Sequence, residues 1–346
     1  MLLANPYQVL LGLVVAVCVL GGNARPGRLR KRDNYVDVLG GANFPDPSIL
    51  DVGGTSYVFG TVDGAGHNVP QTSNPDFNNP SGWSAITDAF PPTDVPAMGS
   101  GGWAAPMTTW GPDVNQLTDY DGSFAMYYSA ALQSDGGIHC VGLARSGVVT
   151  GPYNDSSTEP MICPTSAGGA IDPAGFLDDD NTRYVVYKID GPAINNGGYC
   201  NSPDNPPSTN TSLMLQQVDN DGYTMIGGPA VLYNNQGVSD SYNVEAPTVV
   251  KNDGVYFLFF SSGCTSADSY TVSYVTSTSG SIWGPYGNRQ TLLQTGDYGE
   301  YGPGGADVTP TGGQMVYHSE EASDDDAVRW LNTADIAFSG QTVSIS

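Results

Sequence analysis

The chain has 346 residues and a formal net charge of −24, from 11 Lys and Arg against 35 Asp and Glu. This acidic balance argues against binding to nucleic acid or to an anionic membrane, because both need clustered basic side chains. Charged residues make up only 13% of the chain and hydrophobic residues 39%, a composition that argues against intrinsic disorder. The 45 Gly and 25 Pro are typical of a chain with many short strands and tight turns.

The first 32 residues have the opposite charge. They contain no acidic residue, and five of the 11 basic residues lie between Arg25 and Arg32. An apolar run of 12 residues, Val9 to Leu20, is too short to span a bilayer and has the length of a signal-peptide core. We therefore expect a signal peptide over residues 1–22, a basic propeptide over 23–32 that ends at a dibasic site, and a secreted single domain over 33–346. A lone N-terminal anchor is the alternative for the apolar run.

The cysteines agree with an oxidising compartment. Apart from Cys18 in the leader, the chain has an even number of them, namely Cys140, Cys163, Cys200 and Cys264. Of the three pairings, we favour Cys140–Cys163 with Cys200–Cys264. Asn154 and Asn210 begin Asn-x-Ser sequons and are the predicted glycosylation sites. The spacing of the cysteines and histidines indicates no zinc site.

A pattern of strand, tight turn and strand recurs five times along the domain. Each copy has an apolar segment with one acidic residue, followed by a turn and an aromatic strand, and most turns carry the Asp-Gly or Gly-Gly that hairpins favour. The predicted hairpins cover residues 44–59, 110–128, 170–187, 244–260 and 304–318. Their acids, separated by 67, 59, 73 and 62 residues, are Asp46, Asp113, Asp172, Glu245 and Asp307. A third alternating segment follows three of the hairpins, over 139–145, 212–218 and 270–275.

Five all-β units of about 60 residues, with almost no helical periodicity, predict an all-β fold, specifically a five-bladed β-propeller. A β-sandwich is the alternative, but it gives no reason for an acid at the same place in each unit. The first strand of a propeller blade lines the central axis, so we expect these acids to converge at one mouth of the channel. Carboxyls packed together with few cations raise one another's pKa, and a protonated carboxyl that faces an ionised one is the machinery of glycoside hydrolysis.

Five short motifs occur in order at the spacing of the blades. They are Phe44-Pro-Asp46-Pro-Ser48, Trp110-Gly-Pro-Asp113-Val114, Ile171-Asp172-Pro173, Val244-Glu245-Ala-Pro247 and Gly302-Pro-Gly304. Each is weak alone, but the ordered set is specific and resembles the motifs of glycoside hydrolase family 43 over about residues 35–340. The resemblance implies a five-bladed propeller that hydrolyses arabinose- or xylose-containing plant polysaccharides with inversion.

The resemblance implies roles for three acids. Asp46 matches the family's general base, Glu245 its general acid, and Asp172 the residue that tunes and orients the acid. In the implied single displacement, Asp46 deprotonates a water on one face of the sugar while Glu245 protonates the leaving oxygen on the other. An inverting pair needs its carboxyls roughly 6.5–9.5 Å apart, which leaves room for the water.

Aromatic faces stack on the C–H surfaces of sugars, so aromatic residues near the motifs are candidate substrate contacts. Trp110 and Asp113 are expected to form a sugar platform and a pocket wall, and blade packing is the alternative for Trp110. Further substrate-binding candidates are Trp103, His67, Tyr242 and Tyr301.

The chain departs from the family pattern at two positions. Gly111 stands where the second motif often has Ala, and Gly305 stands where many members have a His that helps to hold a central ion or ordered water. A His-bound axial calcium is therefore in doubt, and we expect no metal ligand and no required cofactor. His318, on the following strand, is expected to be structural.

The leading prediction is a secreted, monomeric α-L-arabinofuranosidase or arabinanase that acts on plant polysaccharide or oligosaccharide. β-Xylosidase activity on the same scaffold is the first alternative. Many xylosidases of the family carry an extra C-terminal β-sandwich, for which the residues after the fifth motif leave no room. A non-catalytic sugar-binding propeller is the second alternative, and it predicts the loss of one of the three acids. A retaining fructosidase would have Asn before its nucleophile Asp, whereas Pro45 precedes Asp46.

Overall fold

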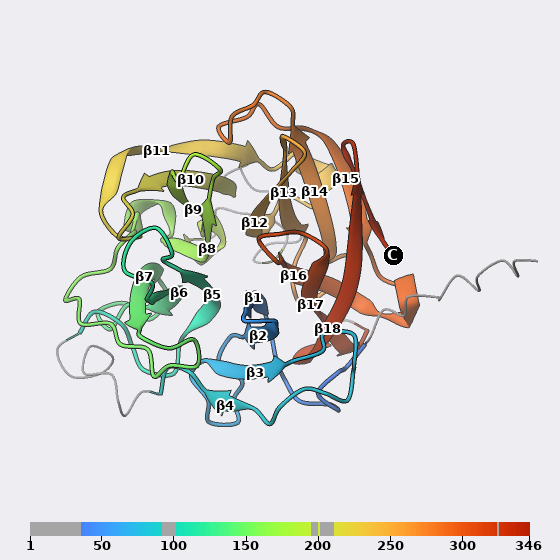
Figure 1. Ribbon diagram of the computed structural model, residues 1–346, viewed down its shortest axis with the longest axis horizontal. Helices are drawn as coiled ribbons and strands as arrows, with labels where there is room; N and C mark the ends of the chain where they lie inside the picture. The colour runs from blue at the N-terminus through green and yellow to red at the C-terminus, as the bar shows by residue number, and fades with distance from the viewer. Residues whose placement is uncertain (1–35, 92–101, 195–199, 201–210, 324) are drawn as a thin grey trace, which may run out of the picture. The chain divides into compact units, whose positions relative to one another are not determined.

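The computed structural model describes residues 36–91, 102–194, 200, 211–323 and 325–346. These residues form five antiparallel sheets, which are arranged around a central axis as the blades of a β-propeller (Figure 1). The predicted all-β fold and five-bladed propeller are confirmed. The predicted signal peptide and propeptide, and the sequon at Asn210, lie outside the described residues.

Each predicted hairpin supplies the first two strands of one blade. Blade 1 consists of β1 (Ser48–Val52), β2 (Thr55–Phe59), β3 (Pro70–Asn74) and β4 (Thr87–Asp88). Blade 2 consists of β5 (Trp110–Gln116), β6 (Phe124–Ala131) and β7 (His139–Ser146). Blade 3 consists of β8 (Ala170–Leu177), β9 (Arg183–Ile189), β10 (Ser212–Val218) and β11 (Met225–Asn234). Blade 4 consists of β12 (Val244–Asn252), β13 (Val255–Ser262), β14 (Thr271–Ser277) and β15 (Gly287–Leu293). Blade 5 consists of β16 (Tyr301–Val308), β17 (Gln314–Ala322), β18 (Asp325–Ser339) and β19 (Thr342–Ile345).

The helical content of the described residues is limited to short 3-10 turns. These are η1 (Thr165–Ala167), η2 (Gly191–Ile194), η3 (Gly237–Asp240) and η4 (Asp297–Gly299). None of the helices in the described ranges has both the length and the apolar character that a membrane span requires.

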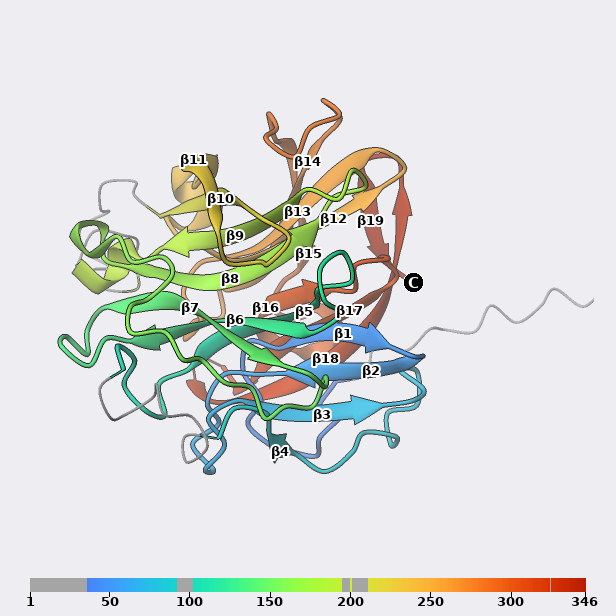
Figure 2. The ribbon, with the colours of Figure 1, turned by 60° about the vertical axis from the view of Figure 1, so that its left-hand side comes forward.

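The first strand of every blade lies nearest the axis (Figure 1). Figure 2 shows three of these strands, β8, β5 and β1, side by side. The second strands, such as β6 and β13, are buried along almost their whole length, because neighbouring blades cover both of their faces. This explains why the second strands are apolar and aromatic rather than alternating.

Within the described ranges, five apolar clusters hold the propeller together, one between each pair of neighbouring blades. The cluster between blades 5 and 1 includes Phe44, Val58 and Leu331. Backbone hydrogen bonds reinforce that junction, since the amides of Val38 and Phe44 donate to the carbonyls of Leu331 and Arg329 on β18, at 3.0 and 2.8 Å. The segment before β1 thus closes the ring, and it also carries Asp46 to the axis.

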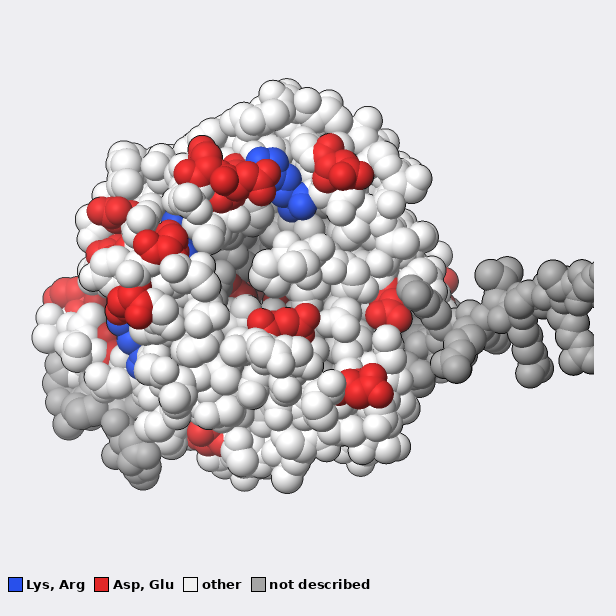
Figure 3. Space-filling view, viewed as in Figure 1, with Lys and Arg blue, Asp and Glu red and all other residues white. Residues whose placement is uncertain are grey.

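The structure pairs Cys140 with Cys163 and Cys200 with Cys264, which is the pairing that the sequence favours. Asn154 is exposed, as a glycosylation site must be. On the face shown in Figure 3, acidic side chains lie in separate groups and basic side chains are few. The negative charge on this face is therefore dispersed and not gathered into one patch.

Candidate active site

The five innermost strands share a backbone feature where they reach the axis. One residue in each blade has a left-handed backbone, with φ between 46° and 56°, and these residues are Asp46, Gly111, Asp172, Ala246 and Gly305. Each of them, with the two residues that follow, lines a narrow central channel. A left-handed conformation is unusual for residues other than Gly and costs of order 1–3 kcal/mol, so three strained residues at one mouth mark a functional site.

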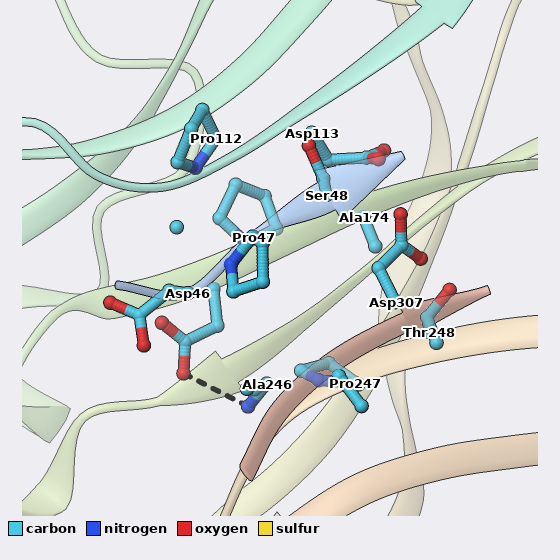
Figure 4. A pocket seen from close by; sticks show the side chains of 15 residues that line it. Asp46, Pro47, Ser48, Pro112, Asp113, Ala174, Ala246, Pro247, Thr248 and Asp307 are labelled. Carbon is cyan, nitrogen blue, oxygen red and sulfur yellow. Dashed lines mark hydrogen bonds between the residues drawn. The ribbon is translucent and has the colours of Figure 1, made fainter. Parts of the chain in front are cut away.

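The positions of these left-handed residues show that the five acids do not lie at equivalent places in their blades, which corrects the prediction from the sequence. Asp46 and Asp172 occupy the left-handed position itself, and Glu245 directly precedes it. Asp113 and Asp307 come two residues after it and lie deeper in the channel, away from Asp46 (Figure 4). Successive residues on one face of a strand differ by two positions, so the same face carries a shallow acid in some blades and a deep one in others.

Asp46, Asp172 and Glu245 all line one cavity of about 710 Å³ that adjoins the channel. The cavity walls come from blades 1 to 5, and they include the disulfide between Cys200 and Cys264. Of the five acids in the predicted hairpins, the three to which the family resemblance gives catalytic roles therefore share one cavity, which Asp190 also lines.

Asp46 is held at both oxygens of its carboxylate. The Thr61 hydroxyl donates to Oδ2 at 2.6 Å, and Arg329 Nη1 donates to Oδ1 at 2.9 Å. Burial raises the pKa of Asp46, but the charge of Arg329 and these hydrogen bonds outweigh it, so the pKa lies below its ordinary value. Asp46 is thus ionised over most of the pH range, as a general base must be.

Asp172 contacts the backbone of the residue that follows Glu245. Its Oδ2 accepts the N–H of Ala246 at 2.9 Å, the contact drawn in Figure 4. Burial, followed by the nearby Glu245 carboxylate, raises the pKa of Asp172 to about 7. Asp172 therefore contacts the backbone next to Glu245 and holds a proton to higher pH than an ordinary Asp.

Glu245 is surrounded by hydrogen-bond donors. Lys188 Nζ and Asn243 Nδ2 donate to its Oε2 at 2.8 and 2.9 Å, and the Tyr270 hydroxyl also bonds its carboxylate. Burial raises the pKa of Glu245, but the charge of Lys188 and these hydrogen bonds lower it below its ordinary value overall. In the resting site the raised pKa thus belongs to Asp172 and not to the residue with the matching role of general acid.

The other sequence-predicted contacts divide into one that faces the cavity and several that do not. Trp110 lines it with 37% of its surface exposed, and its ring stacks on His139 with centroids 3.6 Å apart. Trp103 is buried between blades 1 and 2, where it stacks on Tyr128 and donates to Ser157. The residues outside the cavity lining are Trp103, His67, Tyr242, Tyr301 and Asp113.

The surroundings of these residues explain why they lie outside the cavity lining. His67 is paired with Asp63 at 2.5 Å within its own loop. Tyr301 is 40% exposed at the first residue of β16, and Tyr242 is half-buried beside η3. Asp113 lies too deep in the channel to form a wall of the cavity.

Asp113 and Asp307 form a buried acidic pair in the channel. Asp113 Oδ2 accepts the Gly175 N–H at 2.7 Å, and Asp307 Oδ2 accepts the Ile49 N–H at 2.8 Å. Burial and the charge of Asp307 raise the pKa of Asp113 to about 8, while burial raises that of Asp307 to about 6. Through these hydrogen bonds the pair joins blades 1, 2, 3 and 5, and the raised pKa values favour a state in which the pair carries a proton.

The variant Asp113→Asn tests whether the protonated Asp113–Asp307 pair stabilises the fold, through the pH dependence of the free energy of unfolding. Because both folded-state pKa values are raised, the stability that the pair contributes is complete below the unfolded value near pH 3.8 and is lost as the pH rises through about 6 and about 8. The amide keeps an acceptor for Gly175 and cannot ionise. We expect the variant to be more stable than the original chain at pH 8, by more than about 1.4 kcal/mol, the equivalent of one pKa unit, and not at pH 3. Urea denaturation at both pH values measures the difference, and an equal effect at both would contradict the account.

Sequence reasoning missed the cations and the hydroxyl of the cavity. Lys188, Arg329 and Tyr270 line it and contact the two acids with matching catalytic roles. A signal for Lys188 existed, because it is a charge near the end of the strand β9, in a stretch that is otherwise apolar and aromatic from Tyr184 to Ile189. A charge at such a position needs a buried partner.

Gly305 and His318 show whether the residues at the axis could hold the His-bound ion that the family resemblance implies. A Cβ on Gly305 would lie 2.6 Å from the His318 ring, so this imidazole occupies space that a side chain at 305 would need. His318 is fully buried, its Nδ1 accepts the Asp46 N–H at 3.0 Å, and burial followed by the charge of Arg329 lowers its pKa to about 3. The neutral ring then carries its proton on Nε2, so neither nitrogen offers a lone pair to a cation. The residues present do not fit a His-bound ion, and the contact with Asp46 gives His318 a structural role.

The model for glycosyl hydrolases family 43 matches residues 38–334. A β-D-galactofuranosidase of Aspergillus niger is 26% identical over 64% of this chain and 59% of its own length. An extracellular endo-α-(1→5)-L-arabinanase of Bacillus subtilis is 27% identical over 61% of this chain and 49% of its own length. The chain thus spans about half to three fifths of these relatives.

Among solved structures, a thermostable family-43 glycoside hydrolase superposes with a TM-score of 0.68 at 21% identity, over 90% of this chain and 96% of the other. An endo-1,4-β-xylanase from Bacteroides thetaiotaomicron superposes with a TM-score of 0.65 at 21% identity, over 91% and 97% of the two chains. These two likenesses support the propeller fold, and the family match covers most of the chain. The chain belongs to glycosyl hydrolase family 43.

Proposed function

We propose that the protein is a secreted, inverting hydrolase of arabinose-containing plant cell-wall polysaccharide, either an α-L-arabinofuranosidase or an arabinanase. The observation that carries this proposal is the single cavity lined by Asp46, Asp172 and Glu245. Similarity to extracellular arabinanases of Bacillus subtilis supports the substrate class, and together with the two disulfides it supports secretion.

The proposed reaction is one displacement. Asp46 takes a proton from a water whose oxygen forms a bond to the anomeric carbon, while the bond from that carbon to the leaving oxygen breaks. Glu245 gives its proton to the leaving oxygen, and Asp172 orients Glu245 through the Ala246 N–H. No step is assigned to a metal or cofactor.

Trp110 is the proposed platform for the sugar. It lines the cavity, and the His139 ring, which also lines the cavity, stacks on it and fixes its orientation. A platform held in this way binds a sugar face without first losing side-chain freedom.

A substrate panel tests the proposal. The panel contains an aryl α-L-arabinofuranoside, an aryl β-D-xyloside, an aryl β-D-galactofuranoside and linear arabinan. We expect the largest kcat/KM for the arabinofuranoside or for arabinan. Turnover of the xyloside alone would establish the β-xylosidase alternative, and binding of arabinan without any turnover would establish the non-catalytic alternative.

A further inference from the structure

Lys188 is a buried cation in the wall of the cavity that holds the three acids. It lies in β9 between Tyr187 and Ile189, and only 2% of its surface is exposed. Its ammonium group is 2.8 Å from Glu245 Oε2 and 3.5 Å from Asp190 Oδ1. Removing a Lys charge from water is costly, so a buried lysine is kept only where carboxylates compensate it.

The contact between Lys188 and Glu245 opposes the proposed role of Glu245 as a proton donor at high pH. A general acid must carry a proton when the leaving oxygen departs, whereas an ammonium at hydrogen-bond distance favours the ionised carboxylate. We propose that Lys188 is a positioning residue that holds Glu245 in the resting site and sets the upper pH limit of catalysis. This inference rests on the proposed function, because it takes Glu245 as the acid.

Some of the groups around Glu245 raise its pKa and others lower it. Those that interact with it electrostatically or by hydrogen bond are Asp172 from β8, Lys188 from β9, Asn243 beside β12, Tyr270 before β14 and His318 from β17. Asp190 faces Lys188, and Asp46 with its partner Arg329 lies across the cavity. His318 is neutral, so among these residues Lys188 is the cation that directly contacts Glu245.

The balance between these groups predicts the effect of removing Lys188. Burial and the Asp172 carboxylate both favour a protonated Glu245. The charge of Lys188, together with the hydrogen bonds from Lys188, Tyr270 and Asn243, outweighs them, so the pKa of Glu245 falls below its ordinary value. Without the ammonium, burial and Asp172 act unopposed by a cation in direct contact. The pKa of Glu245 must then rise.

The test is the pH profile of kcat/KM for Lys188→Met on a substrate with a poor leaving group. The basic limb of this profile reports the acid of the free enzyme. We expect the limb to move to higher pH by about 1–3 units, the usual effect of one close opposite charge. Lys188→Arg keeps the charge, so its basic limb is expected to stay near that of the original chain.

Lys251→Met is the matched control. Lys251 also forms an ion pair, with Asp178 Oδ1 at 2.6 Å, but it does not line the cavity. Its removal is expected to leave both limbs unmoved. Circular dichroism and thermal melting establish that each variant is folded at the pH values used.

Glu245→Gln separates failure of this inference from failure of the proposed function. With an activated aryl leaving group, which needs no protonation, Glu245→Gln is expected to remove the basic limb. If Glu245→Gln keeps the full rate on poor leaving groups, the proposed acid is wrong and the inference falls with it. If Glu245→Gln is inactive there but Lys188→Met leaves the limb in place, the inference alone is overturned. An increase in KM with an unmoved limb would instead make Lys188 a substrate-binding residue, which also overturns it.

Discussion

Glu245→Gln is expected to lower kcat on arabinan oligosaccharides by about 100- to 10,000-fold, the usual contribution of a positioned proton donor. The sugar leaving group is a poor one and needs a proton as the glycosidic bond breaks. Gln has the shape of Glu and keeps an acceptor for Lys188 and Asn243, which both bond Oε2. The variant therefore lacks only the transferable proton, and KM should change little.

The comparison between leaving groups makes this prediction specific. An aryl arabinofuranoside with a strongly acidic phenol leaves without protonation, so the variant should lose little activity on it. Steady-state kinetics on both substrates measure the ratio. An equal loss on both substrates would show that the substitution damages the site in some other way, and a full rate on both would place the acid elsewhere.

Asp46→Asn is expected to lower kcat on both classes of substrate, again by about 100- to 10,000-fold. Attack by water is required whatever the leaving group, and an amide cannot accept the proton. The contacts of Arg329 and Thr61 fix the position of residue 46 and should still place an amide oxygen there.

Asp113→Asn is the control for this substitution. It makes the same change in the corresponding motif of blade 2, but at the deeper position outside the cavity lining. It should keep kcat close to that of the original chain. Parallel kinetics on oligosaccharide and aryl substrates distinguish the two variants, and a loss confined to the oligosaccharide would contradict the role of Asp46 as base.

The repeat made the fold predictable. Strand, turn and strand patterns at blade spacing depend on local turn chemistry and side-chain alternation, which a sequence displays directly. The acids at the mouth were predictable for a related reason, because first strands of a propeller must face the axis. The depth of each acid was not predictable. Asp113 and Asp46 look alike in their motifs, and only the left-handed residue, which is Gly111 in one blade and Asp46 in the other, reveals the offset of two positions.

The partners of the acids could not be read from the chain either. Lys188 lies 57 residues before Glu245, and Arg329 lies 283 residues after Asp46. Their contacts exist only because neighbouring blades meet at the axis and the ring closes between blades 5 and 1. Trp103 illustrates the opposite error, since an aromatic residue near a motif packs as readily between blades as against a sugar.

The anomeric configuration of the first-formed product tests the central claim most directly. Hydrolysis of an aryl α-L-arabinofuranoside in deuterated buffer, followed by proton NMR before mutarotation, reports this configuration. A single displacement with Asp46 as base and Glu245 as acid predicts that the β-anomer forms first. Initial formation of the α-anomer would require a covalent intermediate and would contradict the assignment of both residues.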